Sequence, residues 1–267
     1  MLAGCSSSPA GPRAPDGGTT PATCSTPLVC GDDGAVHTCD GQVVGDVQER
    51  CAAHGQACSL GRCTTLTCYY AEARTRTLSG CLFYTLQPDN VAADEAALTS
   101  YVITNAGSDP ANVRLEHAMP GTSAATGWEL VKSVQIPANS AGSLQAGGLQ
   151  VTNPGITPFS AVRISSDRPI TVSEIESDDV GQPATSTSGT VLLPLQSLGT
   201  TYRAVTYAQE ATDDVQQWVG NRGGAARVII VGTQAGTKVS FRPVTAVSGD
   251  VGQLVNSLAA GDTLPIT

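Results

Sequence analysis

The distribution of cysteine constrains this chain more than any other feature. All nine cysteines lie within the first 81 residues of 267, and none follows Cys81. Such crowding is typical of a small unit that cannot bury enough apolar surface and is closed by disulfide bonds, which form in oxidising compartments. The sequence therefore predicts a chain that resides outside the cytoplasm.

Eight of these cysteines are expected to pair, each bridge stabilising the fold by about 2–4 kcal/mol. They are Cys24, Cys30, Cys39, Cys51, Cys58, Cys63, Cys68 and Cys81. Spacing does not select one connectivity. A zinc site is the alternative, because His37 and His54 lie among them, but no Cys-x-x-Cys pair occurs. We expect both histidines in exposed loops, and no metal or other cofactor.

Cys5 stands apart from the cluster. The segment Leu-Ala-Gly-Cys at 2–5 resembles the lipobox of bacterial lipoproteins, which implies cleavage before Cys5 and attachment of lipid to it. Two or more acyl chains anchor a protein stably. Only Met1 precedes the box, so we expect a start assigned too late or a trimmed chain. A spare thiol in a disordered tail is the alternative. Ser6 and Ser7 follow the cysteine, and in this they resemble the residues at the same positions in lipoproteins that are sent to an outer membrane.

Composition excludes several classes of protein. Charged residues make up 14% and aromatic residues 4% of the chain, which also contains 29 glycines and 16 prolines. This favours short strands and turns over long helices. A net charge of -9 leaves no basic stripe for nucleic acid. The longest aliphatic run, 228–231, is far shorter than the roughly 20 residues that span a bilayer.

Changes in composition divide the chain into four segments. We predict a lipobox and disordered spacer over 1–23, a cysteine-rich disulfide module with linker over 24–80, a first β-sandwich unit over 81–199 and a second, truncated β unit over 200–267. Within the module, turn residues at Gly34 or Gly41 predict a hairpin. Its expected core residues are Val43, Val44 and Val47, and 69–79 is expected to form a short helix or linker.

From residue 82 onward, strand-like runs recur between turn signals. They cover 82–86, 100–105, 112–118, 128–136, 161–166, 170–177, 202–208, 226–233 and 237–244. Apolar and polar residues alternate clearly where Val113 and Leu115 lie on the face opposite to Arg114 and Glu116. This predicts a strand with one buried face and one solvent-exposed face. No amphipathic helix of 12 or more residues interrupts them, so the predicted fold class is all-β, with antiparallel β-sandwich units in tandem.

A weak internal repeat supports the tandem arrangement. Residues 101–118 and 226–244 both show a strand, a turn containing glycine and a second strand. In the first copy further strands follow, whereas the second copy ends with the chain. We therefore expect the natural polypeptide to continue past Thr267.

The β region resembles the N-terminal domain of IgGFc-binding protein and its bacterial relatives over about residues 80–267. The residues that carry the resemblance are Ile164, Ser165, Pro169 and Ile170; Leu193, Pro194, Leu198, Gly199 and Tyr202; and Ala260, Gly261, Asp262 and Thr263. It implies an extracellular β-rich binding domain, often beside cysteine-rich modules. It assigns no residue to immunoglobulin contact.

Motifs of catalysis are missing from the sequence. It contains no Gly-x-Ser-x-Gly, His-Glu-x-x-His or Gly-x-x-x-x-Gly-Lys pattern. His117 would have to serve any Ser-His-Asp arrangement. Glu174 and Glu176 share one face of a predicted strand, with Asp178 and Asp179 following. They could ligate calcium or act as acid and base, but such pairs commonly solvate an outer face.

The two tryptophans are the remaining candidates for ligand contact. Trp128 and Trp218 each lie beside turn residues, where an indole can contact a sugar or protein, although a Trp at a strand end more often plugs a core. Trp218 is the better candidate, because it lies in a predicted long loop.

These observations favour a non-enzymatic, lipid-anchored binding or adhesion protein of the outer membrane or cell surface. Its loops would recognise an extracellular protein or glycan, and its lipid would be its contact with the membrane. The alternatives are a structural envelope or matrix component without a discrete ligand and, third, an extracytoplasmic hydrolase.

Overall fold

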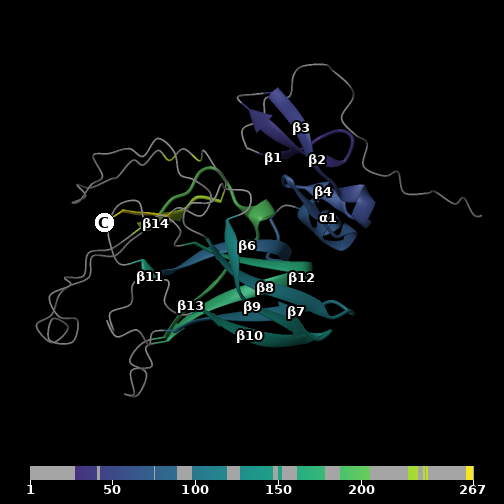
Figure 1. The fold of residues 1–267 in the computed structure, drawn as a ribbon. Coiled ribbons are helices and arrows are strands. Elements are labelled where there is room, and N and C mark those ends of the chain that lie inside the picture. Colours follow the sequence, from purple (N-terminus) through teal and green to yellow (C-terminus); the bar gives the residue numbers. More distant parts are fainter. Residues whose placement is uncertain are drawn as a thin grey trace, which may run out of the picture.

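The computed structural model describes twelve stretches of the chain, and the fold is mostly β (Figure 1). The described residues are 28–40, 43–74, 76–88, 98–118, 127–146, 150–151, 161–177, 187–204, 228–233, 237, 239 and 263–266. The predictions for the spacer, Cys5, Cys24, Trp218, Asp178 and Asp179 lie outside them. None of the helices in the described stretches is long and apolar enough to cross a membrane.

The cysteine module begins with a three-stranded antiparallel sheet. Its strands β1 (Leu28–Cys30), β2 (Ala35–Asp40) and β3 (Val43–Arg50) follow one another in the order β1-β2-β3. Gly34, at φ +71°, lies in the turn between β1 and β2, where a residue without Cβ adopts that backbone at no steric cost. The predicted turn at Gly34 is confirmed, and Gly41 lies outside the described residues.

The rest of the module is small and compactly connected. A 3-10 turn η1 (Cys51–His54) leads to the hairpin of β4 (Ala57–Ser59) and β5 (Arg62–Thr64), and then to helix α1 (Leu66–Glu72). Thr65 caps α1, its hydroxyl accepting from the Cys68 amide at 3.3 Å. The sequence predicts a short helix or linker over 69–79; the helix begins earlier, at Leu66, because Thr65 supplies the cap, and it ends at Glu72.

Three disulfide bonds connect these elements. Cys30–Cys58 joins β1 to β4, Cys51–Cys63 joins η1 to β5, and Cys68–Cys81 joins α1 to the first strand of the larger sheet. Cys39 is disulfide-bonded as well. Seven of the eight cysteines that are expected to pair are therefore disulfide-bonded, and Cys24 lies outside the described residues. The Cys68–Cys81 bridge fixes the module to the β region.

The predicted module core is wrong. Val43, Val44 and Val47 are 66%, 38% and 38% exposed, because β3 is an edge strand and all eight of its residues are exposed. The buried cluster instead consists of Val36, Cys51 and Cys58, with Leu28 and Cys63 packed against it. Cystine sulfur thus replaces aliphatic side chains inside the module.

The β region contains one eight-stranded sheet. Its strands are β6 (Gly80–Pro88), β7 (Leu98–Asn105), β8 (Ala111–Ala118), β9 (Trp128–Ile136), β10 (Ser140–Ala146), β11 (Gln150–Val151), β12 (Ala161–Ser177) and β13 (Thr187–Val191). The N-terminal part of β12 pairs with β6 and β8, and its C-terminal part pairs with β7 and β13. β9 extends the first half beside β8, and β10 extends the second half beside β7. The sheet therefore folds over along β12 and nearly closes.

Strand β12 merges two strands that were predicted separately, 161–166 and 170–177. The expected turn around Pro169 does not form; instead the register with β6 shifts between Ser165 and Ile170. Proline has no N–H to donate, and an irregularity in the pairing tolerates it. One continuous bent strand can then serve both halves of the sheet.

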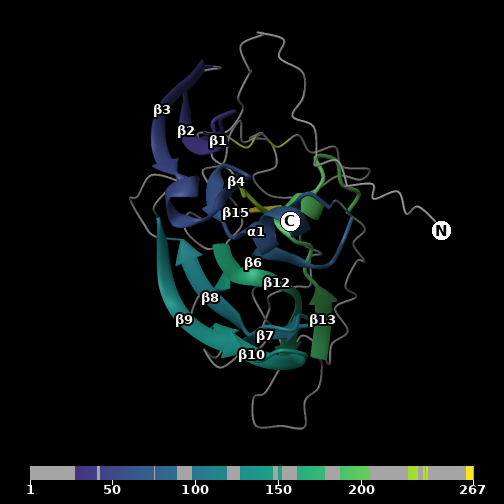
Figure 2. The same ribbon diagram turned by 90° about the vertical axis from the view of Figure 1, so that its right-hand side faces the viewer.

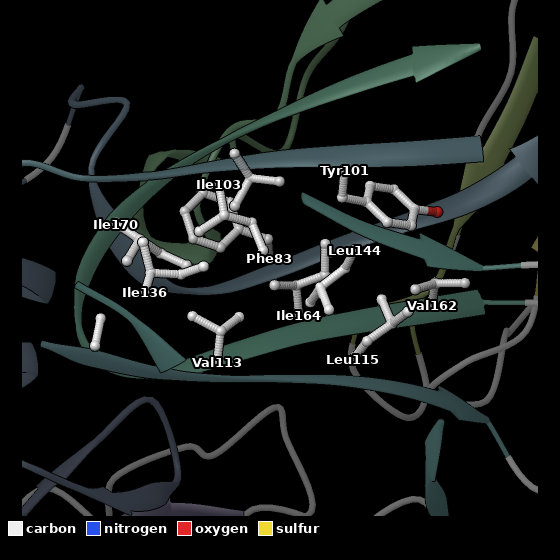
Figure 3. Close-up of a cluster of buried hydrophobic side chains, with 12 residues drawn as sticks. Phe83, Tyr101, Ile103, Val113, Leu115, Ile136, Leu144, Val162, Ile164 and Ile170 are labelled. Carbon is white, nitrogen blue, oxygen red and sulfur yellow. The ribbon is translucent and has the colours of Figure 1, made fainter. Parts of the chain in front are cut away.

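The two halves enclose one hydrophobic core (Figure 3). Twelve buried residues form it: Phe83, Tyr101, Ile103, Ala111, Val113, Leu115, Ile136, Leu144, Val162, Ile164, Ile170 and Val172. The predicted alternation is confirmed at Val113 and Leu115. Glu116 departs from it, since this residue is only 4% exposed on the outer face.

Beyond the sheet, the described C-terminal elements are short. They are the 3-10 turn η2 (Leu195–Ser197) and the antiparallel pair of β14 (Val228–Val231) and β15 (Thr263–Ile266). The expected strand over 202–208 is wrong for Tyr202, Arg203 and Ala204, which have no strand structure, and from residue 205 onward it lies outside the described residues. The tandem sandwich and the segment boundaries remain predictions.

Candidate functional site

The module docks through α1 on the outer side of β6 and β12 (Figure 2). Thr65 Oγ1 donates to the Asp167 carbonyl at 2.8 Å, and Arg168 donates to Thr67 Oγ1 at 3.0 Å. Together with Cys68–Cys81, these contacts hold the helix against the bent strand. We call the polar surface between the two parts, built from Arg62, Glu72, Tyr84, Glu116, Trp128 and Arg163, the seam.

On the module side of the seam, Arg62 forms an ion pair with Glu72. The two side chains are 29% and 1% exposed. Burial lowers the pKa of Arg62, and the neighbouring carboxylate of Glu72 opposes that change. A buried charge is strongly destabilising without an opposite charge beside it. The pair therefore holds β5 against α1 where the module meets the sheet.

On the sheet side, the Glu116 carboxylate forms ion pairs with two arginine side chains. Its carboxylate accepts from Arg163 Nε at 2.8 Å and lies 3.2 Å from the Arg114 guanidinium. Ser165 Oγ also donates to it at 3.4 Å. These contacts explain why Glu116 is buried where the alternation predicts a wet face: charge-assisted bonds replace its water.

Aromatic rings complete the seam. The Arg163 guanidinium lies 4.5 Å from the centre of the Trp128 ring, and Tyr84 meets that indole edge-on at 5.7 Å. Burial raises the pKa of Tyr84, while Arg163 and Arg62 oppose the rise. Because a guanidinium occupies one face of the indole, the structure supports the packing role of Trp128 over that of a sugar platform.

His117 lies on the opposite, inner face of the same half of the sheet. Its Nε2 is 2.8 Å from Glu129 Oε2, and it pairs in register with Val162. The partner found among the described residues is thus a glutamate on the next strand, rather than a serine. Within the described stretches, the contact with Glu129 orients the imidazole.

Glu174 lies where the sequence did not predict it. Its side chain was expected to solvate an outer face, but the residue is 7% exposed and accepts from the Thr85 hydroxyl. Thr85 is adjacent to Val162, and Val162 is adjacent to His117. Glu174 and His117 therefore belong to one polar rim at the end of the core, while the side chain of Glu176 lies outside the described residues.

Metal-ligating residues do not gather in the described stretches. No group of three or more His, Cys, Asp or Glu side chains there could hold a metal ion. His54 is exposed in η1, as expected, but the loop placement of His37 is wrong. His37 lies in β2 with 14% of its side chain exposed, because Asp33 and Gly45 enclose the ring.

The sequence does not reveal the seam, because its members come from six separate elements. Arg62 and Glu72 are ten residues apart, and Glu116 and Arg163 are 47 apart. One signal existed: Arg163 and Glu116 are charged residues inside strand patterns of a chain with few charges.

Comparison with known families gives one finding. A family model described as IgGFc binding protein matches residues 188–267. The resemblance inferred from the sequence is confirmed over those residues, which include β13 apart from Thr187, together with η2, β14 and β15. The match covers the segments with Leu193, Pro194 and Tyr202, and with Asp262 and Thr263.

Other comparisons add little. A search of curated proteins finds no match. A crystal structure of a Thermotoga maritima protein aligns with 44% of this chain and 97% of its own, at 14% identity and a TM-score of 0.29. No common fold is inferred at that score.

Proposed function

We propose that this chain is a non-enzymatic binding protein of an extracytoplasmic surface, which recognises an extracellular protein or glycan. The family match over residues 188–267 carries the proposal, since that family is described by binding to the Fc part of immunoglobulin G. A protein ligand is the choice that this match favours. The disulfide bonds of the module support an oxidising compartment.

We assign a separate role to each part of the chain. The eight-stranded sheet supplies a rigid scaffold, and loops on such a scaffold commonly carry recognition. We assign Trp218 to ligand contact and Cys5 to lipid attachment. The lipid would hold the chain at an outer membrane or cell surface, with residues 6–23 as its tether.

Binding is tested with the oxidised full chain and two probes, an immobilised Fc fragment of immunoglobulin G and a glycan array. Saturable binding to either probe supports the proposal, and Trp218→Ala should then weaken it. Trp128→Ala serves as the matched control, because this indole is packed against Arg163. Weak, non-saturating signals with both probes would contradict the proposal, and self-association in light scattering would favour a structural component.

Lipid attachment is tested separately in bacterial cells expressing the chain behind a lipoprotein signal sequence. Feeding an alkyne-tagged fatty acid should label the wild type and leave Cys5→Ser unlabelled. Equal labelling of both would refute the anchor without affecting the binding proposal.

A further inference from the structure

The His37 side chain bridges two parts of the module through both of its ring nitrogens. Nε2 lies 2.8 Å from Asp33 Oδ1, in the turn between β1 and β2, and Nδ1 lies 3.1 Å from the Gly45 carbonyl oxygen on β3. The fit is close, since a Cβ at Gly31 would approach the ring to 2.6 Å. The imidazole therefore occupies a defined place between turn and strand.

Both partners of this ring are acceptors. A carboxylate and a backbone carbonyl have no proton to give, and a neutral imidazole has one N–H whereas an imidazolium has two. Both contacts can be hydrogen bonds only when His37 carries its second proton. After that proton leaves, one ring nitrogen would point its lone pair at an oxygen.

The Gly45 contact lies at an irregular point of β3. The pairing between β2 and β3 shifts between His37, which faces Val47, and Cys39, which faces Val44. Gly45 and Asp46 therefore bulge, and side chains of β2 bind their carbonyls: His37 binds that of Gly45, and Thr38 Oγ1 donates to that of Asp46 at 3.5 Å. Bulges of this kind set the twist of an edge strand.

We propose that protonation of His37 holds β3 in its bulged shape, and that loss of the proton releases the strand around Gly45 from β2. The device is a pH switch on an exposed edge strand. It controls how Val43, Val44 and Val47 are presented to the surroundings.

The neighbouring charges support this direction. The hydrogen bond to Asp33, followed by that to Gly45, raises the pKa of His37, while desolvation and, less strongly, the charge of Arg50 oppose the rise. The same bond lowers the pKa of Asp33, whose second oxygen lies 4.0 Å from Arg50. The other charged groups on the turn and on β3 are Asp32, Asp46 and Glu49, and β1 and β4 bring none. Two further elements contact β2: η1 brings His54, and β5 brings Arg62.

The sign of the pH dependence follows. A raised histidine pKa gives stability that is complete below the ordinary value of about 6.5 and is lost as the pH rises through the raised value. At the acid end, the contact is lost as the pH falls through the lowered pKa of Asp33. β3 should thus be held firmly in mildly acidic solution and loosened in alkaline solution.

Nuclear magnetic resonance of the oxidised, ¹⁵N-labelled full chain tests the switch. The ring nitrogens of His37 should titrate above pH 6.5, and the amide shifts of Gly45 and Asp46 should follow the same curve. The protection factors of these two amides, taken relative to the base-catalysed exchange of an unstructured chain at each pH, should fall as the proton leaves. Asp33→Asn should move both curves to lower pH together, whereas His54→Gln, in exposed η1, should move neither.

Titration of His37 at or below pH 6.5, or β3 amides that do not follow it, would overturn the proposal. The wild-type titration decides this by itself if Asp33→Asn fails to fold.

Discussion

The cysteine module and the eight-stranded sheet reach stability by different means. The module buries three residues in its cluster, two of them cystines, and leaves β3 exposed. The sheet buries twelve residues and contains one half of a disulfide bond, Cys81. A small unit cannot bury enough apolar surface to offset its chain entropy. Crosslinks substitute for a core in the module, whereas burial suffices in the sheet.

The largest expected effect lies in the core of the sheet. Phe83 is fully buried, so Phe83→Ala should lower the free energy of unfolding by about 3–5 kcal/mol through lost burial and a cavity. Urea denaturation of the oxidised chain measures it. Leu130→Ala, at a 46% exposed position, is the control and should change little. A loss below about 1 kcal/mol for Phe83→Ala would show that the core does not stabilise the sheet.

Removing one crosslink should affect the module selectively. Cys51→Ser with Cys63→Ser opens a bridge between residues 12 apart, which should cost about 3 kcal/mol. Hydrogen exchange should rise in peptides from 28–64 and stay unchanged in peptides from 98–118. Equal loss of protection in both regions would mean that the two parts unfold as one.

The seam sharpens the comparison, because it couples the two parts. Glu72→Ala leaves Arg62 without its partner in a largely buried place, which should cost about 2–3 kcal/mol. The double variant with Arg62→Met and Glu72→Met should recover most of that loss. Glu49→Ala, on exposed β3, is the control. A Glu72→Ala variant that is as stable as this control would show that the Arg62–Glu72 ion pair does not stabilise the protein.

The smallest expected effect is a pH dependence confined to the module. Above neutral pH, the loss of the His37 contacts should make 43–50 more susceptible to limited proteolysis, while fragments that begin in the sheet persist. Asp33→Asn should shift the onset of this susceptibility to lower pH, because the hydrogen bond to Asp33 is the largest cause of the raised His37 pKa. Cleavage of β3 that is the same at pH 6 and pH 9 would contradict it.

The sequence predicts more of the sheet than of the module. Alternation locates β6, β7, β8 and β9, since a period of two follows directly from strand geometry. It does not locate β10 or β13, whose runs of Ser, Gly, Thr and Ala carry little apolar contrast. Nor does it show that β12 continues through Pro169, which a shift in the pairing accommodates.

In the module, the pattern of apolar and polar residues predicts the wrong core. The valines of β3 suggest a core, but cystines occupy the interior and the strand lies at an edge. Pairing of cysteines depends on contacts between distant residues, which local pattern does not encode. The same reason hides the seam, whose ion pairs join strands far apart in sequence, and places Glu174 inside rather than outside.

The difference between the two parts is tested most directly by hydrogen exchange before and after complete reduction, with thiol titration to verify the reduced state. Cys30 is exposed, so its bridge to Cys58 is open to attack by a dithiol. We predict that peptides from 28–64 lose their protection while those from 98–118 and 161–177 keep it. Loss of protection in all of them together, or a module that stays protected with its thiols free, would contradict the account.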